Sequence, residues 1–291
     1  MRQGCAFLAG GLLALSTCVM VNFAPTVFAT GSVNVNVSVT QQAPSIVNWN
    51  QGKNSDIVAI GISRPDERGM ALAREAAIMA AQRNLVSIAQ GLQINSETTM
   101  RDLIIESDVV NRKITGVLRG AQIVEENSMP DGGYYVKMRV PLYGASGSIA
   151  AAVMPSLLSE TPAPFAKPDK NVGFDQVSGY TGVIIDASGL GLEPTFSPVI
   201  YDDGGRVVYG VENLQYDAVI SEGMVGYSQS IGEGAERAGT NPLVVKAVEV
   251  RGGNNSANKV NVVVSVEDAD KILMANESNG ILRQCAVVFV R

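Results

Sequence analysis

Few residues of this sequence could carry out chemistry, because none of its 291 residues is a histidine. Without an imidazole, Ser-His-Asp catalysis, Cys-His catalysis and histidine-ligated zinc are all excluded. Three chemistries remain open to the side chains that are present. They are a Ser-Lys pair, a pair of carboxylates, and calcium bound through oxygen ligands.

Ser256 and Lys259 have the Ser-x-x-Lys spacing of penicillin-recognising enzymes. In those enzymes the serine begins a helix, so that one turn places the lysine beside it. Here the pair follows two glycines and two asparagines, a composition that predicts a hairpin loop. No Ser-Asp-Asn or Lys-Thr-Gly motif accompanies it. We therefore interpret both residues as part of a loop without catalytic function.

Two acidic groups resemble ligand sets, but local structure accounts for both. The run 267–270 follows Ser265, which predicts a capped helix through about Asn276 with carboxylates in its first turn. The run Asp-Asp-Gly-Gly at 202–205 separates two apolar stretches and predicts a hairpin turn. The sequence therefore predicts no catalytic residue, no cofactor and no metal site, and we expect that the protein is not an enzyme.

Cysteine chemistry is limited in the same way. Cys5 and Cys18 lie in the first 29 residues, which leaves Cys285 without an intramolecular disulfide partner once those residues are removed. Cys285 belongs to the apolar run 281–290, which is typical of a strand. We therefore predict that it is a small buried hydrophobic residue rather than a nucleophile.

The elements that would position these residues begin with an α+β arrangement at 57–143. A strand is predicted at 57–62, and apolar and alanine positions at three- and four-residue steps predict a helix over 66–92. A second helical stretch follows at 98–118, and then a hairpin formed by strands 121–126 and 134–140. This order predicts helices packed on one face of a mixed or antiparallel sheet. Before this domain, an extended segment is predicted at 30–56, and it includes an alternating stretch at 33–40.

A second domain is predicted at 171–291, after a Pro-rich linker at 144–170. Its helix is the one capped by Ser265, so the domain ends in a β-α-β unit. The predicted strands are 181–187, 197–201, 206–209, 243–250, 260–265 and a last one that starts at 281. Together the two parts give a two-domain α+β fold with a β-rich C-terminal domain.

One Gly-rich stretch of the C-terminal domain, 221–239, predicts a mobile surface loop. Loops carry binding residues more often than sheet interiors do, so this stretch is the candidate partner-contact site. Its candidate contact residues are Glu222, Met224, Tyr227 and Glu233.

Residues 1–29 predict where the protein works, because they have the features of a bacterial export signal. Arg2 precedes an apolar stretch, and Val27-Phe28-Ala29 supplies the small residues of a cleavage site. A cleaved protein would begin at Thr30 and lie in the periplasm or at the cell envelope. An alternative is lipidation at Cys18, although Thr17 is unusual before a lipid-bearing cysteine. Membrane association is expected only in that alternative.

Part of the N-terminal domain resembles a known family, over about residues 57–143. It is similar to the lipoprotein-20 family of bacterial surface proteins and to the N-terminal domain of flagellar assembly protein T. This resemblance implies an exported, non-catalytic envelope component, sometimes associated with flagella, and supplies no catalytic residues. The segments that carry it are Ala73–Ala77, Ala80–Leu85, Gly116, Gly120-Ala121 and Tyr135–Val140.

Two functions follow from this sequence. The favoured one is a non-catalytic, exported envelope protein of structure or assembly, including a flagellum-associated role, with envelope or flagellar proteins or further copies of itself as partners. The alternative is a periplasmic module that binds a glycan or a small polar ligand. Sugars usually stack on exposed aromatic rings, and the only tryptophan, Trp49, lies outside both predicted cores. Nucleic acid is not expected as a partner, because 28 acidic residues outnumber 22 basic ones.

Overall fold

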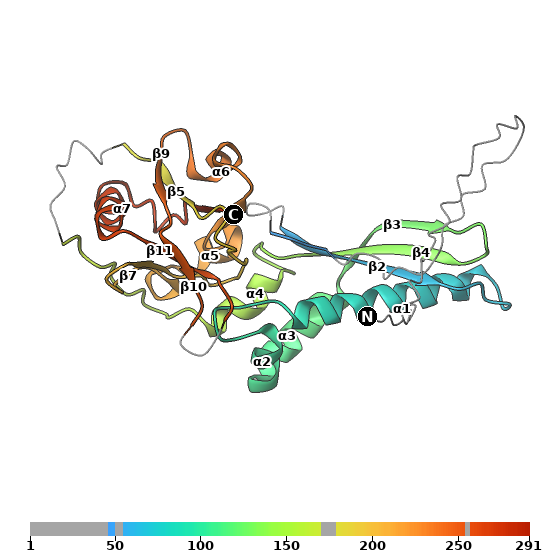
Figure 1. Ribbon diagram of the computed structural model, residues 1–291. Helices are drawn as coiled ribbons and strands as arrows, with labels where there is room; N and C mark the ends of the chain where they lie inside the picture. The colour runs from blue at the N-terminus through green and yellow to red at the C-terminus, as the bar shows by residue number, and fades with distance from the viewer. Residues whose placement is uncertain (1–45, 50–54, 170–178, 254–256) are drawn as a thin grey trace, which may run out of the picture. The chain divides into compact units, whose positions relative to one another are not determined.

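The computed structural model shows an α+β protein, which confirms the predicted fold class (Figure 1). The export signal, the alternating stretch 33–40 and Ser256 lie outside the described residues. The structure describes residues 46–49, 55–169, 179–253 and 257–291.

The N-terminal part has the predicted order of strands and helices, with one additional short strand in front. Its elements are β1 (Ile46–Asn48), β2 (Asp56–Ser63), α1 (Met70–Gln90), α2 (Met100–Glu106), α3 (Asp108–Arg119), β3 (Gln122–Ser128) and β4 (Tyr134–Pro141).

The four strands of this part form one antiparallel sheet in the order β1-β2-β4-β3. Helix α1 packs along one face of it (Figure 1), through Leu85 and alanines that recur every four residues and are fully buried. Gly61 of β2 permits this approach, because an added Cβ would lie 2.0 Å from the carbonyl oxygen of Ala77. Small residues on both elements therefore set the distance between helix and sheet.

The helical stretch predicted at 98–118 is divided in two at Ser107. Thr99 and Asp102 form a capping box that begins α2, and the Ser107 side chain accepts a hydrogen bond from the Val110 amide to begin α3. A polar cap satisfies amides that a helix start leaves without partners. The interruption is therefore a second helix start.

The C-terminal part is richer in strands, as predicted. Helix α4 (Ile149–Val153) and η2 (Met154–Ser156) precede it, within the predicted linker. Its own elements are β5 (Gly182–Asp186), β6 (Ile200–Asp202), β7 (Val207–Tyr209), η4 (Val211–Asn213), α5 (Tyr216–Glu222), β8 (Gly226–Ser228), α6 (Ile231–Ala238), β9 (Pro242–Lys246), β10 (Glu249–Arg251), β11 (Asn261–Val264), α7 (Val266–Asn279) and β12 (Val287–Val290).

These strands form two sheets, one parallel and one mixed. The parallel sheet has the order β8-β12-β5-β9, and the mixed sheet has the order β10-β11-β6-β7. The single strand predicted at 243–250 is wrong, because the chain passes from one sheet to the other within it. The amide of Ala247 bonds to the carbonyl oxygen of Asp186 at the end of β5, and that of Val248 bonds to the carbonyl oxygen of Val263 in β11. The last three elements, β11, α7 and β12, follow one another as the predicted strand, helix and strand, although the two strands belong to different sheets.

The predicted linker at 144–170 is only partly extended. Its first half contains α4, in which Ile149 and Val153 are fully buried. Residues 162–168, in the Pro-rich half, form no helix or strand, and this half is fastened to the C-terminal part. Ala163 donates its amide to Glu212, and the ring of Phe165 stacks on Tyr209 at 6.5 Å between centroids. The structure therefore holds this segment by contacts as well as by chain connectivity.

Candidate interaction site

The Gly-rich stretch 221–239 is not a surface loop, so this part of the sequence prediction is wrong. It contains the end of α5, all of β8 and all of α6. Gly234 lies in α6 where the helix meets the parallel sheet, and a Cβ there would be 3.1 Å from Val288 and 3.3 Å from Ile184. Glycine serves close packing here, whereas the sequence prediction took it as a sign of a loop.

Two of the four candidate contact residues are therefore buried. Met224 is fully buried, and Tyr227 of β8 is buried with its hydroxyl bonded to the Thr195 backbone at 3.0 Å in both directions. Neither side chain can contact a partner without unfolding of its surroundings. The prediction of Met224 and Tyr227 as contact residues is wrong for this reason.

Glu222 and Glu233 lie nearer the surface, in different surroundings. Glu233 is exposed in the first turn of α6, where its carboxylate accepts the Gln229 amide at 3.0 Å. Glu222 ends α5 and lines a polar pocket of about 380 Å³ together with Arg237, Glu236 and Gln284. The structure does not bring the four predicted residues together into one site.

The guanidinium of Arg237 is committed to the backbone around that pocket. Its three nitrogens donate to the carbonyl oxygens of Cys285, Glu222 and Gly223 at 2.9, 2.5 and 2.6 Å. A guanidinium used in this way ties three chain segments together. Three of its five N–H donors are therefore used within the protein.

Cys285 is a buried residue, as predicted. Burial raises the pKa of its thiol, and Tyr209, which donates its own hydroxyl to Met224 at 2.7 Å, lies beside it. The backbone at Cys285 has φ 55°, the left-handed region, which is uncommon for a residue with a Cβ. A buried thiol with a raised pKa has little thiolate near neutral pH and is a poor nucleophile.

We expect Cys285 in the folded protein to react with Ellman's reagent at pH 8 much more slowly than in guanidinium chloride. The raised pKa reduces the thiolate fraction, and burial excludes the reagent. A C285A/Q284C variant is the control, because Gln284 is exposed next to it and a cysteine there should react at once. Equal rates for Cys285 in the folded and unfolded chain would contradict the burial.

The acidic groups have the structural roles that the sequence predicts. Ser265 caps α7 by accepting the Asp268 amide at 3.1 Å, and the 202–205 run turns the chain between β6 and β7. Among the described residues, no three Cys, Asp or Glu side chains are grouped so that they could hold a metal ion.

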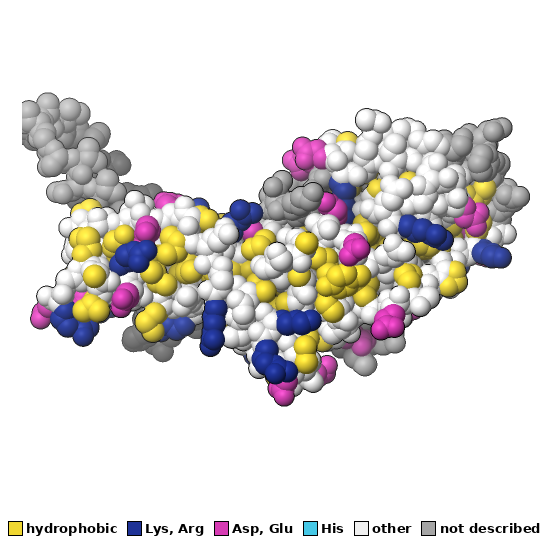
Figure 2. Space-filling view, turned by 180° about the vertical axis from the view of Figure 1, so that it is seen from behind, with side chains coloured by type: hydrophobic (Ala, Val, Ile, Leu, Met, Phe, Trp, Pro, Cys, Tyr) yellow, Lys and Arg dark blue, Asp and Glu magenta, His cyan; other side chains and the backbone are white. Residues whose placement is uncertain are grey.

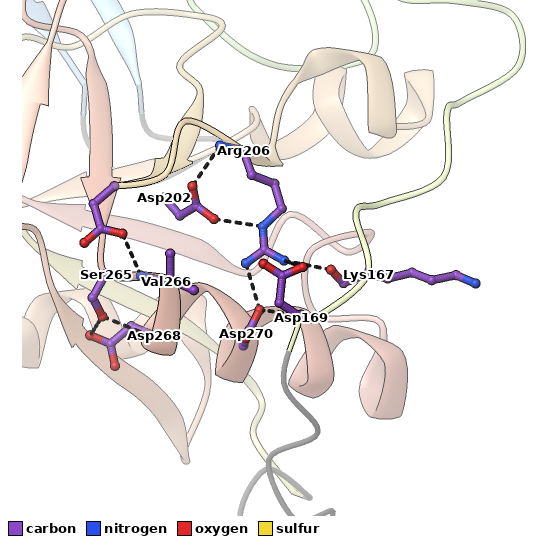
Figure 3. A network of polar contacts seen from close by, with 9 residues as sticks. Lys167, Asp169, Asp202, Arg206, Ser265, Val266, Asp268 and Asp270 are labelled. Atoms are coloured by element: carbon purple, nitrogen blue, oxygen red, sulfur yellow. Dashed lines mark hydrogen bonds and ion pairs between the residues drawn. The ribbon is translucent and has the colours of Figure 1, made fainter.

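Asp202, at the end of β6, also belongs to a network around Arg206, which was not predicted (Figure 3). Arg206 reaches the Asp202 carboxylate at 2.8 Å and the Asp270 carboxylate of α7 at 2.7 Å. It also donates to the Lys167 carbonyl oxygen at 2.8 Å, and Asp169 lies 3.3 Å away. Both Asp202 and Asp270 are buried. The network therefore fixes the end of the Pro-rich segment to the mixed sheet and to α7.

The surface feature best suited to a partner is a groove between α1 and α3. It encloses about 380 Å³ and is mostly apolar. On the face shown in Figure 2, hydrophobic side chains gather in groups, with both basic and acidic side chains among them. The groove is lined by Met79, Gln82, Arg83, Val86, Gln90, Ile104, Asn111, Ile114, Thr115, Leu118 and Arg119.

Sequence reasoning missed this groove. Met79 of α1 is 61% exposed and Val86 is 39% exposed. Two large apolar residues seven positions apart lie on the same side of a helix. That spacing was the signal in the sequence for an apolar surface on α1. It does not show that α3 forms the second wall of the groove, because this depends on how the two helices cross.

Comparison with known proteins bears on the C-terminal part only. Residues 182–291 match a family model described as the second domain of Treponema pallidum Tp0624. The match begins at the first residue of β5 and runs through β12. No curated protein matches the chain. Within the described ranges, no helix has the length and apolar character needed to cross a membrane.

Proposed function

We propose that this chain is a non-catalytic, exported protein of the bacterial envelope that acts in structure or assembly, with a flagellum-associated role as one form. The observation that carries this proposal is the apolar groove between α1 and α3. Exposed apolar residues rimmed by polar ones are typical of surfaces that bind other proteins. The chemistry of the chain supports the same conclusion, since it has no histidine and Cys285, the cysteine among the described residues, is buried.

Two observations weigh against the alternative of a glycan or small-ligand module. Trp49 packs edge to face against Phe196 and Tyr227, with centroids 5.1 and 5.9 Å apart, so it is no open stacking platform. The polar pocket near Glu222 is built around Arg237, whose donors already bind backbone carbonyls. The groove remains the better-supported binding surface.

Site-specific photo-crosslinking in the native bacterium tests the assembly function. We expect a photoreactive amino acid at Val86 to give a covalent adduct with one exported protein, identified by mass spectrometry. Val244 on β9 is the matched control, because it is also a valine and is 46% exposed against 39% for Val86. The proposal fails if Val86 gives no adduct, or if both positions give the same adducts.

Export itself is tested by the intact mass of the protein isolated from the cell envelope. We expect a chain that begins at Thr30, because Val27 and Ala29 place small residues at the cleavage site. A mass that corresponds to a diacylated Cys18 at the N-terminus would show that the lipoprotein alternative is correct. A full-length chain that starts at Met1 would contradict export.

A further inference from the structure

The shape of the groove indicates what kind of partner it receives. Its residues on α1 are Met79, Gln82, Arg83, Val86 and Gln90, which recur at three- and four-residue steps along one face. This stripe is about 16 Å long, at 1.5 Å of rise per residue. Four further lining residues, from Asn111 to Leu118, form a similar stripe on α3. A trough between two helices accommodates the side chains of a third helix laid along it.

The lining chemistry requires that this helix be amphipathic. Ile104, Ile114 and Leu118 line the groove, with Met79 and Val86 exposed beside them. Apolar residues at i, i+3, i+4 and i+7 of a bound helix would cover these side chains. Methionine adapts its shape to a partner, and methionine and arginine are both enriched in protein interfaces.

The charges of the groove specify the flanks of the partner helix. Arg83 on α1 and Arg119 on α3 are its only charged lining residues, so both walls carry positive charge. Arg83 bonds to the Met79 carbonyl oxygen at 3.4 Å, and within the described parts of the chain neither arginine forms an ion pair. We infer that the groove binds an acidic amphipathic helix of a partner protein, an inference that rests on the proposed function.

Two other occupants fit these charges less well. A second copy bound through the same groove would bring arginines against arginines, which is unfavourable. Residues 30–45 of the same chain contain no acidic side chain that could pair with Arg83 or Arg119. Both alternatives are outcomes of the experiment described next.

The test measures binding of a synthetic helix to the chain that begins at Thr30, by fluorescence anisotropy. The probe is a labelled 18-residue peptide with leucines at i, i+3, i+4 and i+7 and glutamates beside them. A second peptide carries lysines in place of the glutamates. We expect the glutamate peptide to bind about tenfold more tightly than the lysine peptide. Arg83 and Arg119 each gain an ionic partner from the glutamates, whereas the lysines repel them.

The decisive variant is R83E/R119E, which should reverse the preference and bind the lysine peptide more tightly. R64E/K259E is the control, because it changes the net charge equally at two exposed residues outside the groove, and it should keep the parental preference. Equal affinities of the two peptides for the parent chain, or an unchanged preference in R83E/R119E, would overturn the inference.

Three further results would also overturn it. One is a dimer in sedimentation velocity that R83E/R119E dissociates, which would assign the groove to a second copy. Another is binding to phosphatidylglycerol vesicles that R83E/R119E abolishes, which would assign it to anionic lipid. The third is tighter peptide binding after removal of residues 30–45. A crosslink at Val86 without any peptide preference would leave the assembly function standing while this inference fails.

Discussion

Replacing Arg206 with methionine should lower the free energy of unfolding by about 3–5 kcal/mol, because it removes one partner of a buried ionic network. The Asp202 side chain is 2% exposed and the Asp270 side chain 1%, and both lose the guanidinium that neutralises them. An unpaired buried carboxylate costs far more than the pair itself contributes. Urea unfolding followed by circular dichroism measures the loss.

Two further variants separate this effect from the loss of side-chain volume. R206M/D202N/D270N should recover part of the stability, because it removes the buried negative charges along with the positive one. R68M should have little effect on stability, since the Arg68–Asp66 pair is at the surface, with the Arg68 side chain 76% exposed. Equal losses for R206M and R68M would show that the network contributes little.

The second large effect is expected at Gly61, where alanine should destabilise the protein by about 3 kcal/mol, the upper end of the usual cost of overpacking. The added Cβ would meet the Ala77 carbonyl oxygen at 2.0 Å and the Ala81 amide nitrogen at 2.4 Å. Both atoms belong to the backbone of α1, so no side-chain rotation relieves the overlap. The helix must move away from the sheet instead.

The same substitution at Gly116 is the matched control, with the opposite expected sign. Gly116 lies inside α3, and a Cβ added there meets no atom within 4 Å. Alanine should therefore stabilise the protein by about 0.5–1 kcal/mol, because glycine is a poor helix former. Thermal unfolding of G61A and G116A side by side measures both. A stable G61A protein would contradict the close packing of α1 on β2.

The parts of the fold that the sequence predicted correctly depend on local rules. The helix over 66–92 follows from apolar spacing, the cap of α7 follows from Ser265 and Asp268, and the β6–β7 turn follows from its glycines and aspartates. Each of these signals lies within a few turns of one element. No knowledge of distant residues was needed for them.

The incorrect predictions concern residues whose roles are set by distant partners. Gly234 is a packing residue because Val288 and Ile184 lie against it, and the change of sheet at Ala247 depends on Asp186. Trp49, expected outside the cores, packs on Phe196 far along the chain. The groove likewise needs α1 and α3 together, so no single stretch of sequence indicates it.

The position of β12 within its sheet governs when the C-terminal part can fold. Strand β12 follows the other strands of this sheet in the sequence, yet it lies between β8 and β5. Without residues 287–290, β5 and β8 have no common neighbour, and the buried Val183, Ile184 and Ile185 of β5 lack a strand that pairs with them. Pairing over such sequence separations is slow. The parallel sheet is therefore complete only after β12 has joined two strands that lie far from it in the sequence.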